Sequence, residues 1–231
     1  MSRDAINCVC TSYKLTLTTQ HSALSTQHSA LFMHHLILFT RYPEPNRTKT
    51  RLIPKLGAEG AANLHREMTE HTLSQVLPLN VSMEVRFAGG SLELMQAWLG
   101  SGLVYQPQGE GDLGERMASA FDDSFKVGAC KTIIIGSDCP GIDAQILTTA
   151  FAHLNDVDLV LGPALDGGYY LIGLRRLIPE LFKNINWGTS KVLQQTINVA
   201  HSLGLCYQCL APLADVDRPE DLEVWHNLQQ N

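Results

Sequence analysis

The sequence predicts a single α/β domain whose mostly parallel central sheet is flanked by helices. Its 231 residues are 45% hydrophobic and 17% charged, proportions that suit one domain with a sizeable core. From residue 33 onward, short apolar segments of strand length alternate with longer amphipathic segments, as they do in βα units. No linker-like stretch interrupts residues 33–231, so we expect them to fold as one unit.

Hydrophobic periodicity places the individual elements. Short apolar runs predict strands at residues 36–40, 83–88, 132–136, 159–162 and 169–174. Apolar spacing of three or four residues predicts one helix through Ala61, Leu64, Met68, Thr72 and Val76, and another through Ile146, Ala150 and Leu154. A last helix is expected after Pro219, because Asp217 has the position of an N-cap and Glu220 that of its capping-box partner.

The net charge of the chain and the length of its apolar runs limit the classes of partner that it could bind. A net charge of −6 and a pI near 5.8 disfavour a nucleic-acid or anionic-membrane surface, which would need a broad basic field. No apolar run approaches the roughly 18 to 20 residues that span a bilayer. We therefore expect a small-molecule ligand, no nucleic acid and no membrane, and the cysteine usage fits a reducing cytoplasm.

The first 32 residues look different from the rest. The segment TQHSAL at 19–24 recurs at 26–31, and neither copy has an apolar face that could pack as a helix or strand. Residues 1–32 are therefore predicted to be low-complexity and disordered. Because Met33 directly precedes the first predicted strand, we hypothesise that translation naturally starts there.

A basic loop follows the first predicted strand. Residues 41–55 contain five cations and one acid, a net +4, so the remainder of the chain carries −10. A loop at the carboxyl end of a strand is where open α/β sheets bind ligands, and Lys49 and Arg51 could screen phosphate charge there. A solvated basic loop with no ligand is the alternative.

Acidic residues at two other places could hold a metal. Asp138 directly follows the predicted strand at 132–136, where a carboxylate can bind Mg²⁺ or Mn²⁺, although capping of the next turn is an alternative role. Asp215 and Asp217 are two residues apart and share a face in extended chain. For Asp217, an N-cap role can coexist with metal binding.

Two glycine-containing segments are ligand candidates of a weaker kind. At 162–171, Gly167 and Gly168 would let a backbone approach a ligand, with Asp166 and Tyr169 at the rim, although an ordinary hairpin turn explains the same residues. The segment GEGDLG at 109–114 matches the dinucleotide fingerprint, but its two acids would repel a pyrophosphate. A dinucleotide-binding oxidoreductase is therefore a minor alternative.

Taken together, these segments resemble a bacterial glycosyltransferase-like family found beside radical-SAM and selenium-domain proteins and assigned in part to arsenosugar biosynthesis. The resemblance runs from Met33 to the end through FTRYPEP at 39–45, KTRL at 49–52, GEGDLGERM at 109–117, GSDCP at 136–140, GPA at 162–164, DGGY at 166–169, WGT at 187–189 and DVD at 215–217. That family is similar to the glycosyltransferase-A superfamily, with molybdenum-cofactor and phospholactate nucleotidyltransferases as distant relatives. The resemblance implies a nucleotide-diphospho-sugar transferase type of fold for residues 33–231.

The resemblance also implies roles for individual residues. The expected catalytic residues are Asp138 and Asp166, and the expected metal ligands are Asp138, Asp215 and Asp217. The expected nucleotide-binding residues are Arg41, Lys49, Thr50, Arg51, Gly114 and Arg116, and the expected substrate-binding residues are Gly167, Gly168 and Tyr169. Asn46 departs from the family, which usually has glycine there, but Asn tolerates a left-handed backbone better than most residues.

The sequence thus predicts a transferase dependent on Mg²⁺ or Mn²⁺ that moves a sugar from a nucleotide-activated donor to a small acceptor. Two alternatives stay open: nucleotidyl transfer from a nucleoside triphosphate to a phosphorylated small molecule, and a non-catalytic nucleotide-binding module. The resemblance further implies a pathway partner of radical-SAM type.

Overall fold

The computed structural model describes residues 34–229, so the predicted disorder of residues 1–32 and the start at Met33 lie outside the described residues. The described chain forms a seven-stranded sheet with strand order β3-β2-β1-β4-β6-β5-β7. The strands are β1 (His34–Arg41), β2 (Ser82–Ala88), β3 (Val104–Pro107), β4 (Lys131–Gly136), β5 (Leu159–Pro163), β6 (Tyr169–Leu174) and β7 (Tyr207–Cys209). Only β6 runs antiparallel to its neighbours, so the predicted mostly parallel sheet is confirmed.

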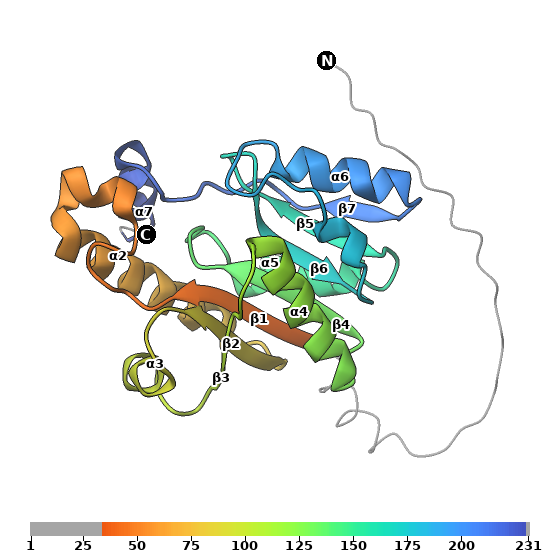
Figure 1. Ribbon diagram of the computed structural model, residues 1–231, viewed down its shortest axis with the longest axis horizontal. Helices are drawn as coiled ribbons and strands as arrows, with labels where there is room; N and C mark the ends of the chain where they lie inside the picture. Colours follow the sequence, from red (N-terminus) through yellow and green to blue (C-terminus); the bar gives the residue numbers. More distant parts are fainter. Residues whose placement is uncertain (1–33, 230–231) are drawn as a thin grey trace.

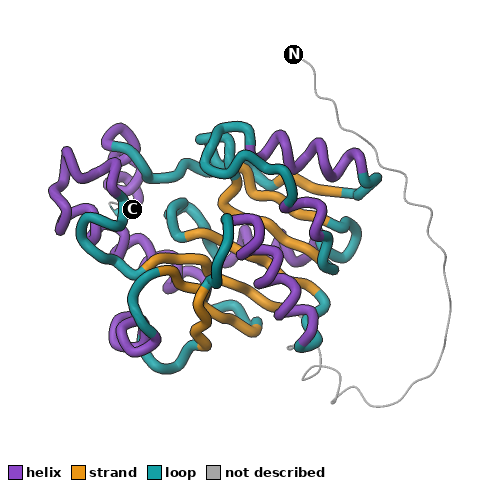
Figure 2. The backbone as a smooth tube through the Cα atoms, in the orientation of Figure 1, coloured by secondary structure: helices purple, strands orange, loops and turns teal. Residues whose placement is uncertain are grey.

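Helices cover both faces of the sheet (Figures 1 and 2). The α-helices are α2 (Ile53–Val76), α3 (Leu92–Leu99), α4 (Leu113–Lys126), α5 (Ala144–His153), α6 (Val192–Ser202) and α7 (Leu222–Leu228). Short 3₁₀ helices are η1 (Thr50–Leu52), η2 (Pro179–Phe182) and η3 (Pro219–Asp221). Among the described residues, no helix combines the length and apolar character needed to cross a membrane.

The central strand β1 is buried on both sides because its side chains alternate between two cores. Leu36 and Leu38 belong to the core that α5 and the end of α2 cover, while Ile37 and Phe39 belong to the core that α4 and α6 cover. A strand buried on both faces has a continuous apolar sequence, which is why the sequence predicted β1, β4, β5 and β6. The predicted strand β2 is less regular, since the polar Glu84 and Arg86 interrupt its apolar residues. The edge strand β3 was not predicted, since it has four residues and three of them are exposed.

The carboxyl-terminal segment returns across the sheet and packs on α2. In Figure 1, the segment after β7 runs over the sheet edge and ends in α7 beside α2. Val216, Leu222 and Trp225 are buried there against Leu52 and Met68. The predicted cap differs in detail: the carboxylate of Asp221, not the side chain of Asp217, accepts the backbone N–H groups of residues 217 and 218. This frees the side chain of Asp217 for other contacts.

The packing of α7 generates a stability prediction. Replacing Trp225 with alanine removes a buried indole from the contact with α2 and should lower the free energy of unfolding by about 3 to 5 kcal/mol. Urea unfolding measures this change. Glu223→Ala, an exposed substitution on the same helix, should change stability by less than about 0.5 kcal/mol, and equal effects of the two variants would contradict the packing.

Candidate active site at the carboxyl edge of the sheet

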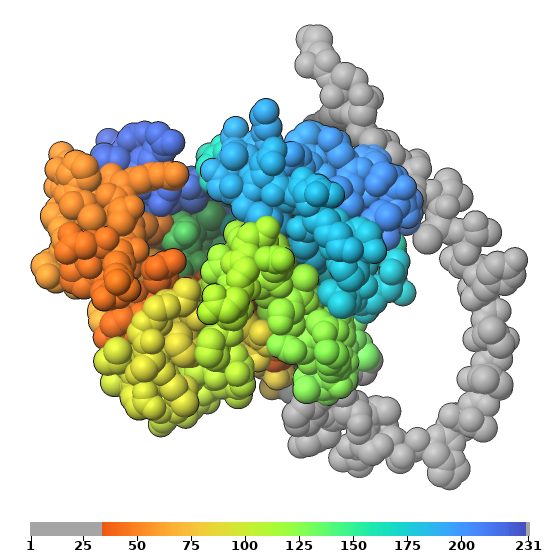
Figure 3. All heavy atoms as spheres, viewed as in Figure 1, coloured from red at the N-terminus to blue at the C-terminus, as the bar shows by residue number. Residues whose placement is uncertain are grey.

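A cleft of about 500 Å³ opens at the edge of the sheet where β1 and β4 end. Figure 3 shows the surface hollowed between the α2 region and the segment after β6. Three segments far apart in the chain supply its polar wall: the loop after β1, the turn after β4, and residues 211–217 of the carboxyl-terminal segment, which we call the strap. Of the predicted site residues, the cleft is lined by Arg41, Lys49, Arg51, Asp138, Asp166, Gly168, Tyr169, Asp215 and Asp217.

The loop after β1 is folded by its own hydrogen bonds. The Thr48 hydroxyl donates to the carbonyl oxygen of Tyr42 at 3.2 Å and accepts the N–H of Glu44 at 3.2 Å. Asn46 and Lys49 both have left-handed backbone conformations, with φ of 64° and 49°. Asn46 thus adopts a left-handed conformation, which Asn tolerates better than most residues.

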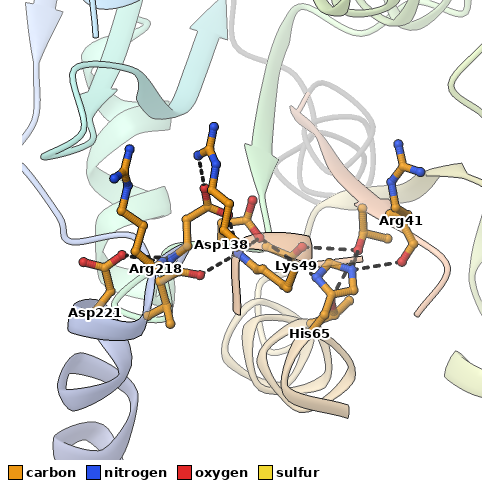
Figure 4. A network of polar contacts seen from close by, with 12 residues as sticks. Arg41, Lys49, His65, Asp138, Arg218 and Asp221 are labelled. Atoms are coloured by element: carbon orange, nitrogen blue, oxygen red, sulfur yellow. Dashed lines mark hydrogen bonds and ion pairs between the residues drawn. The ribbon is translucent and has the colours of Figure 1, made fainter. Parts of the chain in front are cut away.

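The Lys49 side chain ties the loop to the other two segments. Only 4% of the side chain is exposed, and its Nζ lies 2.7 Å from Oδ1 of Asp138 and 3.8 Å from Oδ1 of Asp217. Nζ also donates to the carbonyl oxygen of Val216 at 2.6 Å. Arg51 is exposed and pairs with the same Asp217 carboxylate. Figure 4 shows this chain of polar contacts from Asp221 through Lys49 and Asp138 to His65.

Asp138 projects into the cleft, with 55% of its side chain exposed. Loss of water acts to raise the pKa of this carboxyl, but the charge of Lys49, the proximity of His65 and the hydrogen bond from Lys49 together outweigh that effect and lower the pKa. Its backbone is fixed as well, because its carbonyl oxygen accepts the N–H of Val216 at 2.9 Å. Asp138 is therefore held as a carboxylate at a defined position.

His65 of α2 lies beneath Asp138 and was not predicted from the sequence. Its Nε2 contacts the carbonyl oxygen of Arg41 at 2.9 Å, and a carbonyl can only accept, so Nε2 carries the proton. Burial lowers the pKa of His65, which keeps the ring neutral and leaves Nδ1 as an acceptor 4.0 Å from Oδ1 of Asp138. Within the described chain, Nδ1 has no hydrogen-bond partner. The sequence contained one sign of this role: His65 lies on the same helical stripe as Met68 and Thr72, which are buried in α2.

Buried hydroxyl groups join His65 to the strand ends. The hydroxyl of Thr40, at the end of β1, lies 3.3 Å from Nε2 of His65, 3.2 Å from the hydroxyl of Thr69 and 3.2 Å from that of Ser137. All four residues are buried. This network fixes α2 against β1 and β4 directly below the cleft.

Asp166 and Asp215 supply further carboxylates. Partial burial raises the pKa of Asp215, and the negative charge of Asp166 raises it further. These carboxylates repel one another, and their oxygen atoms are hard donors of the kind that Mg²⁺ or Mn²⁺ prefers. The chemical type of the donors therefore fits the predicted ion. Within residues 34–229, however, no three His, Cys, Asp or Glu side chains converge as a preformed metal site.

Four predicted residues do not line the cleft. Gly114 lies under Trp187, where an added Cβ would come within 2.6 Å of the indole, and Gly167 is packed against the backbone of Ser190, 2.3 Å from such a Cβ. Arg116 donates to the Gln108 side chain at 2.8 Å. Thr50 is exposed in η1. The two glycines therefore serve close packing of the cleft walls.

The GEGDLG segment forms the start of α4. Asp112 accepts the N–H of Glu115 at 2.9 Å, and the Glu115 carboxylate accepts the N–H of Asp112 at 2.9 Å. These reciprocal bonds satisfy the amino end of α4 with acidic groups, which disfavours a bound pyrophosphate. The strand before it, β3, is an exposed edge strand. The geometry of a dinucleotide site is therefore missing from this segment.

The repulsion of Asp215 by the neighbouring carboxylates, of which Asp166 contributes most, predicts a pH-dependent gain in stability for Asp215→Asn. Because the pKa of Asp215 is raised in the folded protein, its ionisation destabilises the fold as pH rises through that pKa. At pH 7 with a chelator present, the variant should be more stable by a few tenths to about 1 kcal/mol, since water screens a half-exposed group. The gain should vanish as pH falls below about 4.

Thermal unfolding at pH 7 and at lower pH tests this expectation. Asp156→Asn is the matched control, because it makes the same change at an exposed acid outside the cluster. A loss of stability in the Asp215 variant at pH 7 would contradict the repulsion.

Comparisons with known proteins add the following. Residues 72–189 match the model of a family described as "Uncharacterized protein conserved in bacteria (DUF2064)". No curated protein matches the chain. A candidate nucleotide-diphospho-sugar transferase from Desulfovibrio desulfuricans G20 is 33% identical with a TM-score of 0.82, over 87% of this chain and 89% of that one.

Two more distant structures share the fold. Glucosyl-3-phosphoglycerate synthase from Mycobacterium tuberculosis, solved with Mg²⁺ and uridine diphosphate, is 12% identical with a TM-score of 0.53, over 88% of this chain and 79% of that one. The inositol-1-phosphate CTP transferase from T. maritima is 13% identical with a TM-score of 0.51, over 86% and 96%. The fold is therefore that of nucleotide-diphospho-sugar transferases.

Proposed function

The chain belongs to the DUF2064 family of bacterial proteins, and we propose that it is a metal-dependent transferase using a nucleotide-activated donor. Glycosyl transfer from a nucleotide sugar to a small acceptor is the preferred reaction. One observation carries the proposal: a single cleft joins the basic loop after β1 to carboxylates from three other segments. Cations and carboxylates together suit a diphosphate and the divalent ion that accompanies it.

Arg41 is the best placed group for a phosphate. It ends β1, lines the cleft, and no described residue forms an ion pair or hydrogen bond with its guanidinium. An Arg without a partner can bind phosphate oxygens with two parallel hydrogen bonds. Arg51 and Lys49 complete the proposed phosphate contacts, although both are engaged by carboxylates before a ligand arrives.

Asp138, Asp215 and Asp217 would hold Mg²⁺ or Mn²⁺, consistent with the Mg²⁺ in the M. tuberculosis synthase structure. When bound, such an ion neutralises charge that develops on a diphosphate leaving group. Asp166, Gly168 and Tyr169 would face the donor sugar or the acceptor. The Asp166 carboxylate accepts the N–H of Gly168 at 2.8 Å, which keeps this bend in one shape.

Nucleotidyl transfer is the second candidate, because the T. maritima CTP transferase shares the fold over nearly its whole length. In that reaction the acceptor would attack the α-phosphate and release pyrophosphate. A non-catalytic nucleotide-binding module would bind without turnover. The cytoplasmic location and the radical-SAM pathway partner remain predictions from the sequence.

Thermal unfolding of the full chain with nucleoside triphosphates and nucleotide sugars, each with and without Mn²⁺ or Mg²⁺, tests the proposal. A specific ligand at about 100 times its Kd stabilises the fold by about 2.7 kcal/mol and should raise Tm by several degrees. We expect the largest shift with a nucleotide sugar plus metal. A shift with one triphosphate alone, and pyrophosphate release, would support nucleotidyl transfer instead.

Asp138→Asn should remove the metal-dependent part of the shift while leaving the fold intact, because it removes one charged ligand at a half-exposed site. Asp156→Asn, the same change outside the cleft, should keep the full shift. No shift with any nucleotide would contradict the proposed function, and an unchanged shift in the Asp138 variant would remove that residue from the metal site.

A further inference from the structure

The ammonium group of Lys49 lies where a bound cation would be expected. Its Nζ is surrounded by Oδ1 of Asp138 at 2.7 Å, the carbonyl oxygen of Val216 at 2.6 Å and Oδ1 of Asp217 at 3.8 Å. Asp138 and Asp217 are the two carboxylates proposed to hold the divalent ion. Lys49 therefore neutralises Asp138 in the protein without ligands and shares the neutralisation of Asp217 with Arg51.

Lys49 and a divalent ion would compete for the same oxygen atoms. Mg²⁺ sits about 2.0 to 2.1 Å from its oxygen ligands, and the lone pairs of Asp138 Oδ1 that face Nζ are already engaged. An ion bound to Oδ1 would also lie within a few ångströms of the ammonium, where like charges repel strongly. Simultaneous occupancy is therefore unfavourable.

Two features of the site allow a divalent ion to replace the ammonium group of Lys49. The ammonium is carried on a flexible four-carbon stem with freely rotating bonds, unlike the planar group of arginine. The Asp138 carboxylate is 55% exposed to the cleft, whereas only 4% of Lys49 is exposed, so an ion can reach the carboxylate from the cleft side. Arg41, which ends β1, and Lys49 both line this cleft.

We propose that Lys49 is the resident counter-ion of Asp138 and Asp217, and that a divalent ion replaces it when nucleotide phosphates draw the ammonium away. The nucleotide part of this inference rests on the proposed function; the competition between Lys49 and metal does not. Metal and nucleotide then bind with positive coupling, and linkage requires each to strengthen the other by the same factor.

Binding of Mn²⁺ alone, followed by the electron paramagnetic resonance signal of the free ion, tests the competition. In Lys49→Gln the ammonium is lost, while a neutral polar amide remains on a slightly shorter side chain. We expect this variant to bind Mn²⁺ about tenfold or more tightly than the unmodified protein. Equal or weaker binding in the variant would overturn the proposal.

Arg47→Gln is the matched control for charge. Arg47 lines the same cleft and carries the same charge, but its ion pair is with Glu44 of its own loop. The Arg47→Gln substitution should change the affinity for Mn²⁺ by less than about threefold. Adding Asp138→Asn to Lys49→Gln should abolish the gain, and a gain that survives would place the ion elsewhere and overturn the proposal.

The unmodified protein provides a second test, which does not depend on folding of the Lys49 variant. Mn²⁺ broadens nuclear magnetic resonance signals of nearby amides, so Gly136 and Val216 report on this site. With UDP as the probe, a given free Mn²⁺ concentration should broaden both signals several-fold more than Mn²⁺ alone. Equal broadening without UDP would overturn the exchange.

The experiments separate this inference from the proposed function. The comparison of Lys49→Gln with the unmodified protein contains no nucleotide, so its outcome is decided even if no nucleotide binds. Failure of UDP and all other nucleotides to bind would contradict the proposed function and the nucleotide-driven step. Tighter Mn²⁺ binding in the variant would still support competition by Lys49.

Discussion

The buried ammonium of Lys49 is the interaction on which the cleft depends. It joins three segments that lie far apart in the chain: the loop after β1, the turn after β4, and the strap, whose Val216 is 167 residues from Lys49. Without Lys49, the Asp138 carboxylate and the carbonyl oxygen of Val216 would have no cation between them, and Asp217 would keep only its ion pair with the exposed Arg51. A partly buried carboxylate pair is unfavourable unless a positive charge accompanies it.

The strap reaches this point because its end is anchored by apolar packing. Val216 is fully buried, its N–H bonds to the backbone of Asp138, and α7 beyond it packs on α2. The same α2 carries His65 and Thr69, whose polar groups meet Thr40 and Ser137 below the cleft. Packing on one side of α2 and polar contacts on the other thus hold the two walls of the cleft together.

The sheet explains why the polar groups meet at all. With β1, β4 and β5 parallel, their carboxyl ends lie at one edge, and the bend between β5 and antiparallel β6 brings Asp166 to that edge too. Ligands of open α/β sheets bind at this edge. The same fold occurs in a glucosyl-3-phosphoglycerate synthase and an inositol-1-phosphate CTP transferase, so the fold alone does not distinguish glycosyl from nucleotidyl transfer.

The sequence by itself determined the fold class, five of the strands and the carboxyl-edge positions of Arg41, Lys49 and Asp138, because hydrophobic periodicity and the loops that follow buried strands are local properties. It did not reveal β3, whose four mostly exposed residues have no periodic pattern, nor the cap by Asp221. Only the tertiary structure placed His65 under Asp138, turned Gly114 and Gly167 into packing positions, and directed Lys49 to carboxylates instead of open solvent. Those outcomes depend on contacts between distant segments, and the energy of such contacts is set by distance and burial, which no local pattern encodes.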